Sequence, residues 1–203
     1  MPGTPRYRGL RRTASRQALL DAAEELIGRR GFAGVSVDEI TARAGVAKGT
    51  FYNHFADKAD VANLIARGIR DELRALIGPM KAVSSDPAHH LAIAMRMFWR
   101  LAVEQPNRAL ILVLLINDPT DVNSPMNAPV RQTLLNGEAS GRFSFASIEA
   151  ALIAVIGIVS AGIRNLIEQP VAEPSQRIRE LTCHVLRSLG LDWREATRLA
   201  SIE

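Results

Sequence analysis

Apolar residues recur along most of the chain at the three- and four-residue spacing of amphipathic helices. The first such segment has apolar residues at positions 18, 19, 22, 23, 26 and 27 and predicts a helix from about residue 13 to Gly31. The same spacing predicts further helices over residues 36–44, 47–55, 58–77, 87–105, 106–116, 129–140, 148–168, 175–189 and 193–201. No window alternates with the period of two expected of β-hairpins. The pattern therefore predicts an all-α chain of about nine or ten helices.

Short local motifs set several of these helix limits. Ser36 and Glu39 have the spacing of a capping box, which marks the start of a helix. Asp57 is placed to cap the long helix that follows it. The Gly78-Pro79 pair predicts that this long helix ends near residue 77.

Two polar segments have no apolar period. Residues 117–127 contain two Pro, three Asn and two Asp, which predicts a loop. Residues 1–12 contain two Pro and two Gly, which predicts a disordered arm. The arginines of this arm are Arg6, Arg8, Arg11 and Arg12. They could reach a DNA minor groove, although a plain disordered tail explains the same composition.

The helices predicted over residues 36–44 and 47–55 are joined only by Gly45 and Val46, and so tight a joint is typical of a helix-turn-helix unit. Gly45 can adopt the positive φ that such a turn requires. The second helix is then free to present its outer face to the major groove of DNA. We expect three apolar anchors to lock the two helices together: Ile40, Val46 and Phe51.

The expected outer face of the second helix is rich in hydrogen-bonding side chains, which suit phosphates and base edges. Gly49 would let the backbone approach DNA closely. Lys58, at the start of the next helix, would lie where a helix N-terminus already favours a phosphate. The polar side chains of this face are Lys48, Thr50, Tyr52, Asn53 and His54.

Charge adds a partner to this picture, because the net charge of +4 is unevenly placed. Residues 1–58 hold the whole excess, whereas residues 59–203 are neutral. Residues 1–16 contain five Arg and no acid. A basic end on a neutral body indicates a polyanion, most often nucleic acid, although a solvated tail would explain the same charges.

Residues 31–58 contain a run of short motifs: Gly31-Phe32, Ala44-Gly45-Val46, Gly49-Thr50-Phe51-Tyr52, His54-Phe55 and Lys58. Together they resemble the DNA-binding domain of the TetR/AcrR family of transcriptional regulators, over about residues 13–62. The chain departs from the family at Ala47, where a Ser often caps the recognition helix, and at Val37, where some members have a phosphate-binding hydroxyl.

The resemblance implies roles for individual residues. Thr50, Tyr52, His54 and Lys58 would position the DNA backbone. Lys48, Gly49 and Asn53 would face the bases, and we add Ser36 to the predicted DNA-binding set.

The family resemblance also implies a homodimer that reads a palindromic operator in double-stranded DNA. The helices at 148–168 and 175–189 would form a four-helix bundle across the dimer axis, although the first of them could instead be internal. A stripe of small residues on the first helix would let the helices of the two subunits approach closely: Ala150, Ala154, Gly157 and Ala161. Apolar residues on the second helix would add buried area: Ile178, Leu181 and Val185.

Members of the family usually hold a small effector in the helical body. Six residues could line an apolar cavity, although ordinary core packing also explains them: Met95, Phe98, Trp99, Leu112, Leu115 and Asn117. Because the polar candidates are few, we expect a largely apolar effector. These polar candidates are His89 or His90, Gln105, Asn117 and Arg131.

Several protein classes find no support in the sequence. The single Cys183 excludes an intrachain disulfide and a Cys-based zinc site. We find no phosphate-binding loop, nucleophile elbow or paired metal motif, and so predict no catalytic residue, metal or cofactor. The longest uncharged apolar run, residues 150–163, has 14 residues, fewer than the ~18 of a membrane span. With no signal peptide pattern either, we expect a cytoplasmic protein without a membrane partner.

The sequence thus predicts a disordered basic arm over 1–12, a helix-turn-helix DNA-binding domain over 13–58, and a helical effector-binding and dimerisation domain over 59–203. The expected function is that of a sequence-specific regulator, a repressor released from its operator by a small, largely apolar effector. The alternatives are a DNA-binding dimer that needs no effector and a helical enzyme.

Overall fold

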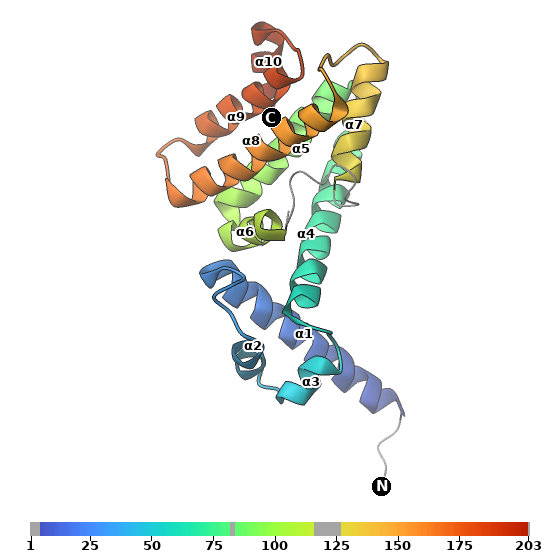
Figure 1. The fold of residues 1–203 in the computed structure, drawn as a ribbon, viewed down its shortest axis with the longest axis vertical. Coiled ribbons are helices and arrows are strands. Elements are labelled where there is room, and N and C mark those ends of the chain that lie inside the picture. The colour runs from blue at the N-terminus through green and yellow to red at the C-terminus, as the bar shows by residue number, and fades with distance from the viewer. Residues whose placement is uncertain (1–4, 82–83, 116–126, 203) are drawn as a thin grey trace.

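The computed structural model describes residues 5–81, 84–115 and 127–202, and in these ranges it contains ten α-helices and no β-strand. The first three helices gather at one end of the molecule and form the head (Figure 1). Helices α5 to α10 form the body at the other end, and α4 runs from one part to the other. The predicted all-α class, with a small N-terminal unit and a larger helical part, is confirmed.

The head consists of α1 (Pro5–Arg30), α2 (Val37–Ala44) and α3 (Lys48–Tyr52). Its core is formed by side chains that are fully or almost fully buried, among them Leu19, Ile40 and Phe51. A helix as short as α3 is not stable alone. The burial of apolar surface, which contributes about 25 cal/mol per Å², holds these short helices together.

The N-terminus differs from the sequence expectation, because the predicted disordered arm is helical from Pro5 onward. Pro5 occupies the first helical position, where its fixed φ favours a helix and its missing N–H costs nothing. Residues 6–12 are mostly Arg and Leu, which are good helix formers. Residues 1–4 lie outside the described part of the chain.

The long helix α4 (Lys58–Lys81) also differs, because it continues through Gly78 and Pro79. Its start is as expected, since an Asp57 carboxylate oxygen accepts a hydrogen bond of 2.8 Å from the Asp60 N–H. Leu73 and Ile77 are buried, and this packing holds the last turns despite the helix-breaking residues.

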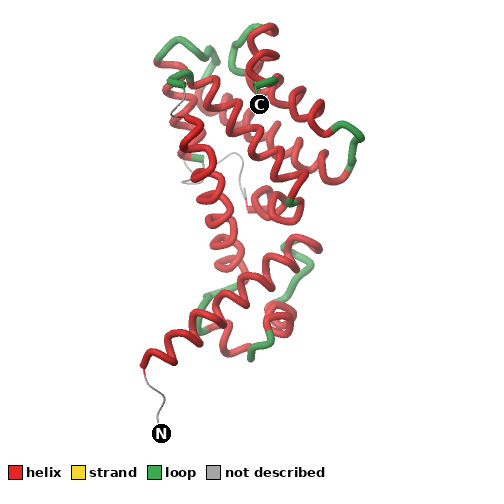
Figure 2. The backbone as a smooth tube through the Cα atoms, turned by 180° about the vertical axis from the view of Figure 1, so that it is seen from behind, coloured by secondary structure: helices red, strands yellow, loops and turns green. Residues whose placement is uncertain are grey.

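The body consists of α5 (Pro87–Glu104), α6 (Pro106–Leu115), α7 (Ala128–Ala139), α8 (Ile148–Glu168), α9 (Pro174–Ser188) and α10 (Trp193–Ala200). Helix α5 is central and packs against α4, α6, α7, α8 and α9. The tube in Figure 2 shows the same arrangement from behind, with helices throughout the body and short loops between them.

Trp99 lies at the heart of the body and has no exposed surface. Its indole N–H donates to the Thr182 hydroxyl at 3.2 Å. Its ring lies so close to Gly162 that an added Cβ there would be 2.6 Å from a ring carbon. A glycine in the middle of α8 therefore lets α5 approach α8 closely.

Among the described residues, α8 is the one helix whose length and composition would suffice to cross a membrane. Its buried face includes Leu152, Val155 and Ile163. This face packs against α5, α7 and α9, as expected of the core helix of a helical bundle.

Candidate nucleic-acid interface and body cavity

The turn between α2 and α3 has the geometry that the sequence predicts. Gly45 has φ 67° and ψ 31°, the left-handed conformation that side chains disfavour. The Val46 N–H donates to the Thr41 carbonyl at 3.1 Å. Ile40 and Phe51 are fully buried and Val46 is half-buried, so the three expected anchors do join the two helices.

The starts of α2 and α3 are as their residues imply, the first capped and the second not. The Ser36 hydroxyl accepts from the Glu39 N–H at 3.2 Å, and a Glu39 carboxylate oxygen accepts from the Ser36 N–H at 2.8 Å. The predicted capping box is thus confirmed. Ala47 begins α3 without a side-chain cap, as expected from its lack of a hydroxyl.

The outer face of α3 is open to solvent. Tyr52 is 54% exposed, and Lys48 and Asn53 are also exposed. An added Cβ at Gly49 would meet nothing within 4 Å, so the backbone is accessible there. These four predicted DNA-binding residues share one exposed surface, with Thr50 half-buried at its edge.

Lys48 is held in place on this surface by an acidic partner. Its ammonium lies 2.7 Å from an Asp38 carboxylate oxygen, and this hydrogen bond raises the pKa of Lys48. Ser36 remains exposed, but its hydroxyl is engaged with Glu39. A contact of either residue with DNA would compete with these bonds.

His54 connects the end of α3 to the N-terminal half of α1. Its Nε2 lies 2.9 Å from the Ser15 hydroxyl oxygen. Burial, followed by the charges of Arg12 and Arg16, lowers the pKa of His54, which favours the neutral ring at neutral pH.

Helices α1 and α3 line a common groove next to the exposed face of α3. Arg11 and Arg12 lie in this groove because α1 extends past Ser15, which the expectation of a disordered arm missed. The side chains of Arg6 and Arg8 lie outside the described part. The lining residues are Arg11, Arg12, Ser15, Val46, Ala47, Thr50, Asn53 and His54.

Lys58, which we predict to contact a phosphate, also bonds within the head. Its ammonium donates to the carbonyls of Phe32 at 2.5 Å and Val35 at 2.6 Å. It also lies 4.2 Å from the centre of the Phe32 ring. Lys58 therefore ties the start of α4 to the loop between α1 and α2.

The body contains a cavity of about 370 Å³ bounded by α4, α5, α6, α7 and α8. Three of the predicted residues line it, namely Met95, Phe98 and Leu112. Trp99 does not, because it points to the α8–α9 side of α5 and is fully enclosed. The Leu115 side chain and all of Asn117 lie outside the described part.

The polar residues of the cavity differ from those expected. Among the polar candidates His90 lines it, whereas His89, Gln105 and Arg131 do not. The sequence reading missed Arg70 and Arg74 on α4. Their signal was a basic pair four residues apart that alternates with the apolar Leu73 and Ile77. The other missed lining residues are Leu73, Ile77, Gly78, Leu91, Ala94, Asn127, Pro129, Val130, Thr133, Val155, Ile156 and Val159.

The small-residue stripe of α8 faces outward in this single chain. Ala150, Gly157 and Ala161 are exposed, Ala154 is half-buried, and Ile153 beside them is 47% exposed. The helix thus keeps one unpartnered face along its length.

The choice of interface residues on α9 needs correction. Ile178 and Val185 are buried inside the chain itself, so they hold α9 to the body. Leu181 is half-buried and remains available at the edge.

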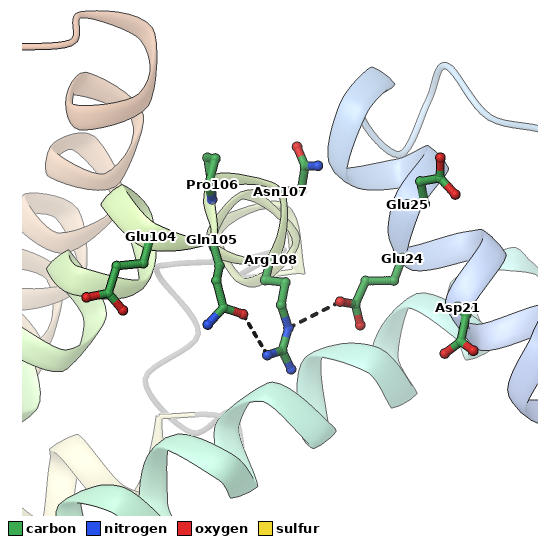
Figure 3. A pocket seen from close by; sticks show the side chains of 8 residues that line it. All are labelled: Asp21, Glu24, Glu25, Glu104, Gln105, Pro106, Asn107 and Arg108. Carbon is green, nitrogen blue, oxygen red and sulfur yellow. Dashed lines mark hydrogen bonds and ion pairs between the residues drawn. The ribbon is translucent and has the colours of Figure 1, made fainter.

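The head and body meet where α1 passes the start of α6. The Arg108 guanidinium lies 3.2 Å from Glu24 on α1 and also donates to Gln105 (Figure 3). It lies 2.9 Å from Glu72 on α4 as well. Burial raises the pKa of Glu24, and the charge of Arg108 opposes this shift. Asn107 packs so closely on α1 that an added Cβ at Gly28 would lie 2.3 Å from it.

Residues 19–65 match the family model described as bacterial regulatory proteins, tetR family. Residues 86–202 match the model described as tetracyclin repressor-like, C-terminal domain. No group of three or more His, Cys, Asp or Glu side chains in the described ranges could hold a metal ion.

Two curated relatives match over part of the chain. The HTH-type transcriptional repressor DhaR of Mycobacterium sp. (strain GP1) is 33% identical over 81 residues, which is 39% of this chain and 41% of DhaR. The HTH-type transcriptional activator FasR of Mycolicibacterium smegmatis is 38% identical over 81 residues, 36% of each chain. The matches thus span only about two fifths of these relatives.

Solved structures resemble the whole fold. RolR in complex with resorcinol has a TM-score of 0.72 at 24% identity, covering 96% of this chain and 97% of RolR. FadR from Bacillus subtilis in complex with stearoyl-CoA has a TM-score of 0.62 at 19% identity, covering 81% of this chain and 96% of FadR. At these identities the likeness establishes the fold.

Proposed function

The chain belongs to the TetR family of bacterial regulatory proteins, and from this premise we propose that it is a sequence-specific, DNA-binding transcriptional repressor of the cytoplasm. The observation that carries the proposal is the exposed face of α3 beside the turn at Gly45. Lys48, Tyr52 and Asn53 present donors and acceptors to solvent on a helix that the major groove is wide enough to admit.

The proposed active unit is a homodimer on a palindromic operator. One α3 reads only half of a site, so two copies related by a two-fold axis are needed. The exposed stripe of Ala150, Gly157 and Ala161 on α8 supports this, because small side chains let two helices approach closely, and Ile153 adds apolar area.

The proposed signal is a small organic effector in the body cavity. The wall of this cavity is mainly apolar, with Leu91, Met95 and Phe98 on α5 and Val155 on α8. The relatives RolR and FadR, solved with resorcinol and stearoyl-CoA, support an organic ligand within this fold.

Helix α6 offers the route from cavity to head. Leu112 lines the cavity, and Arg108 lies one helical turn earlier, where it pairs with Glu24 on α1 and Glu72 on α4. A shift of α6 on effector binding would disturb these ion pairs and move α1, and with it the α3 of each subunit. Release from DNA then follows from the difference in effector affinity between the two arrangements.

The test of DNA reading is selection of binding sites from a random duplex pool by the purified full-length protein. We expect enrichment of a two-fold symmetric site with half-sites about one helical turn apart. Asn53→Ala should change the base preference at one position of each half-site, because it removes about 1–3 kcal/mol of discrimination between bases there. The matched control is Arg179→Ala on the exposed side of α9, which should leave the site and its affinity unchanged.

Failure to enrich any common site would refute sequence-specific binding. An Asn53→Ala variant that selects the wild-type sequence would refute the role of α3 in base readout. Because one relative is named a repressor and another an activator, the sign of regulation is tested separately. In a reporter assay on the selected site, the protein should lower expression, and a rise would identify an activator.

A further inference from the structure

The polar side of the body cavity has a consistent chemical character. The polar side chains that line it are Arg70, Arg74, His90, Asn127 and Thr133. Among the described lining residues there is no Asp or Glu. The rest of the wall is mainly aliphatic and aromatic, so the cavity combines an apolar body with a positively charged side.

The charge is concentrated on one face of α4. Arg70 and Arg74 are four residues apart and therefore project from the same side of the helix. The Arg74 side chain is 57% exposed and lies 3.3 Å from an Asp71 carboxylate oxygen. Arg70 is half-buried and lies nearer the head along α4 than the apolar Leu73 and Ile77.

The surroundings of Arg70 disfavour its positive charge. Burial, followed by the charges of Arg74 and Arg67, lowers the pKa of Arg70, and Asp71 opposes this shift only in part. A guanidinium stays charged at any ordinary pH, so Arg70 keeps a positive charge on this side of the cavity. Planar carboxylates match the guanidinium with two parallel hydrogen bonds.

We propose that the cavity binds an amphipathic organic anion, a carboxylic acid with a hydrocarbon body. This proposal rests on the effector function proposed above and adds the chemical class of the effector. The carboxylate pairs with Arg70, with Arg74 on the solvent side, and the hydrocarbon lies against Leu91, Met95 and Phe98. A volume of about 370 Å³ equals roughly a dozen water molecules and so suits a ligand of about that many non-hydrogen atoms.

Decanoate and 1-decanol form a suitable probe pair, because they share a ten-carbon chain and differ in the charge of the head group. Calorimetric titration of the full-length protein with each compound, below its aggregation threshold, gives the two dissociation constants. We expect decanoate to bind about tenfold or more tightly than 1-decanol, as a charge-assisted hydrogen bond implies.

Three variants on α4 locate the charge that is responsible. Arg70→Gln should reduce the preference for decanoate to about twofold or less. Arg70→Lys, which keeps the charge but loses the planar fork, should keep only part of the preference. Arg67→Gln is the matched control, because it removes the same charge about one helical turn from Arg70. Arg67 is exposed and does not line the cavity. It should keep the full preference.

Two results would overturn the proposal. The first is that 1-decanol binds the wild-type protein as tightly as decanoate, a comparison that needs no variant to fold. The second is that Arg67→Gln loses the preference as fully as Arg70→Gln, which would mean a diffuse surface effect. Circular dichroism melting of each variant verifies that it is folded.

A cavity-filling variant separates this proposal from the effector function on which it rests. Ala94 lines the cavity and is half-buried, so Ala94→Phe should abolish binding of both compounds. If both bind equally and both are lost in Ala94→Phe, the cavity is an effector site and the anion preference alone is wrong. If neither binds the wild-type protein, the effector function fails with it, whereas DNA site selection stands on its own result.

Discussion

Replacing Lys58 with methionine should destabilise the head of the protein and leave the electrostatics of DNA binding largely unchanged. The Lys58 ammonium donates to the carbonyls of Phe32 and Val35 at 2.5 and 2.6 Å and lies 4.2 Å from the centre of the Phe32 ring. Methionine keeps a similar length of apolar side chain but removes the charge and all three donors.

The size of the effect follows from these contacts. A hydrogen bond to a charged group contributes about 1.5–3 kcal/mol, and a cation over an aromatic ring at a partly exposed site about 0.5–1 kcal/mol. Lys58 is half-buried, so water can replace part of what is lost. Taking the low end of each range for the two hydrogen bonds and the ring contact, we expect the free energy of unfolding to fall by about 3.5 kcal/mol.

Urea unfolding followed by circular dichroism measures the loss of stability, and affinity for the selected operator across a salt series measures the electrostatic part. Lys48→Met is the matched control. Lys48 is 56% exposed and paired with Asp38, so its loss should leave the urea midpoint close to that of the wild type. If Lys48 contacts a phosphate, its loss lowers the salt slope by about 0.9.

The opposite pattern at Lys58 would refute this reasoning. If Lys58→Met unfolds at the wild-type urea concentration but loses about 0.9 of the salt slope, then Lys58 contacts a phosphate. The bridge to the loop between α1 and α2 would then be irrelevant to stability.

Three further substitutions test other contacts. Gly162→Ala should lower stability by about 1–3 kcal/mol in urea unfolding, because its Cβ would overlap the buried indole ring, and a wild-type midpoint would contradict this packing. The hydrogen bond from Arg30 lowers the pKa of Glu39 to about 2, below its ordinary value of 4.5. The stabilisation from Glu39 is therefore complete above about pH 4.5 and lost as the pH falls toward 2, and Glu39→Gln should flatten that part of the stability profile. Arg108→Gln, which breaks the ion pair with Glu24, should leave effector affinity in place but weaken effector-driven release of DNA by about 1 kcal/mol of coupling. Full release in this variant, measured by operator affinity with and without ligand, would exclude the α6 route.

The features that the sequence determined by itself are local ones. The capping box of Ser36 and Glu39 involves residues three apart, and the conformation of Gly45 follows from its lack of a side chain. The apolar period placed α8 at residues 148–168, with the same limits as in the structure. Local hydrogen bonding and hydrophobic periodicity act over a few residues, so they can be read without knowing the fold.

The features that only the tertiary structure decided depend on distant partners. Lys58 bonds to carbonyls 23 and 26 residues away, which no local pattern reveals. Phe98 and Trp99 are adjacent and equally apolar, yet one lines the cavity and the other is enclosed against α8 and α9. Neighbours on a helix point about 100° apart, so the packing of other helices, set by the whole chain, decides which of them meets a ligand and which fills the core.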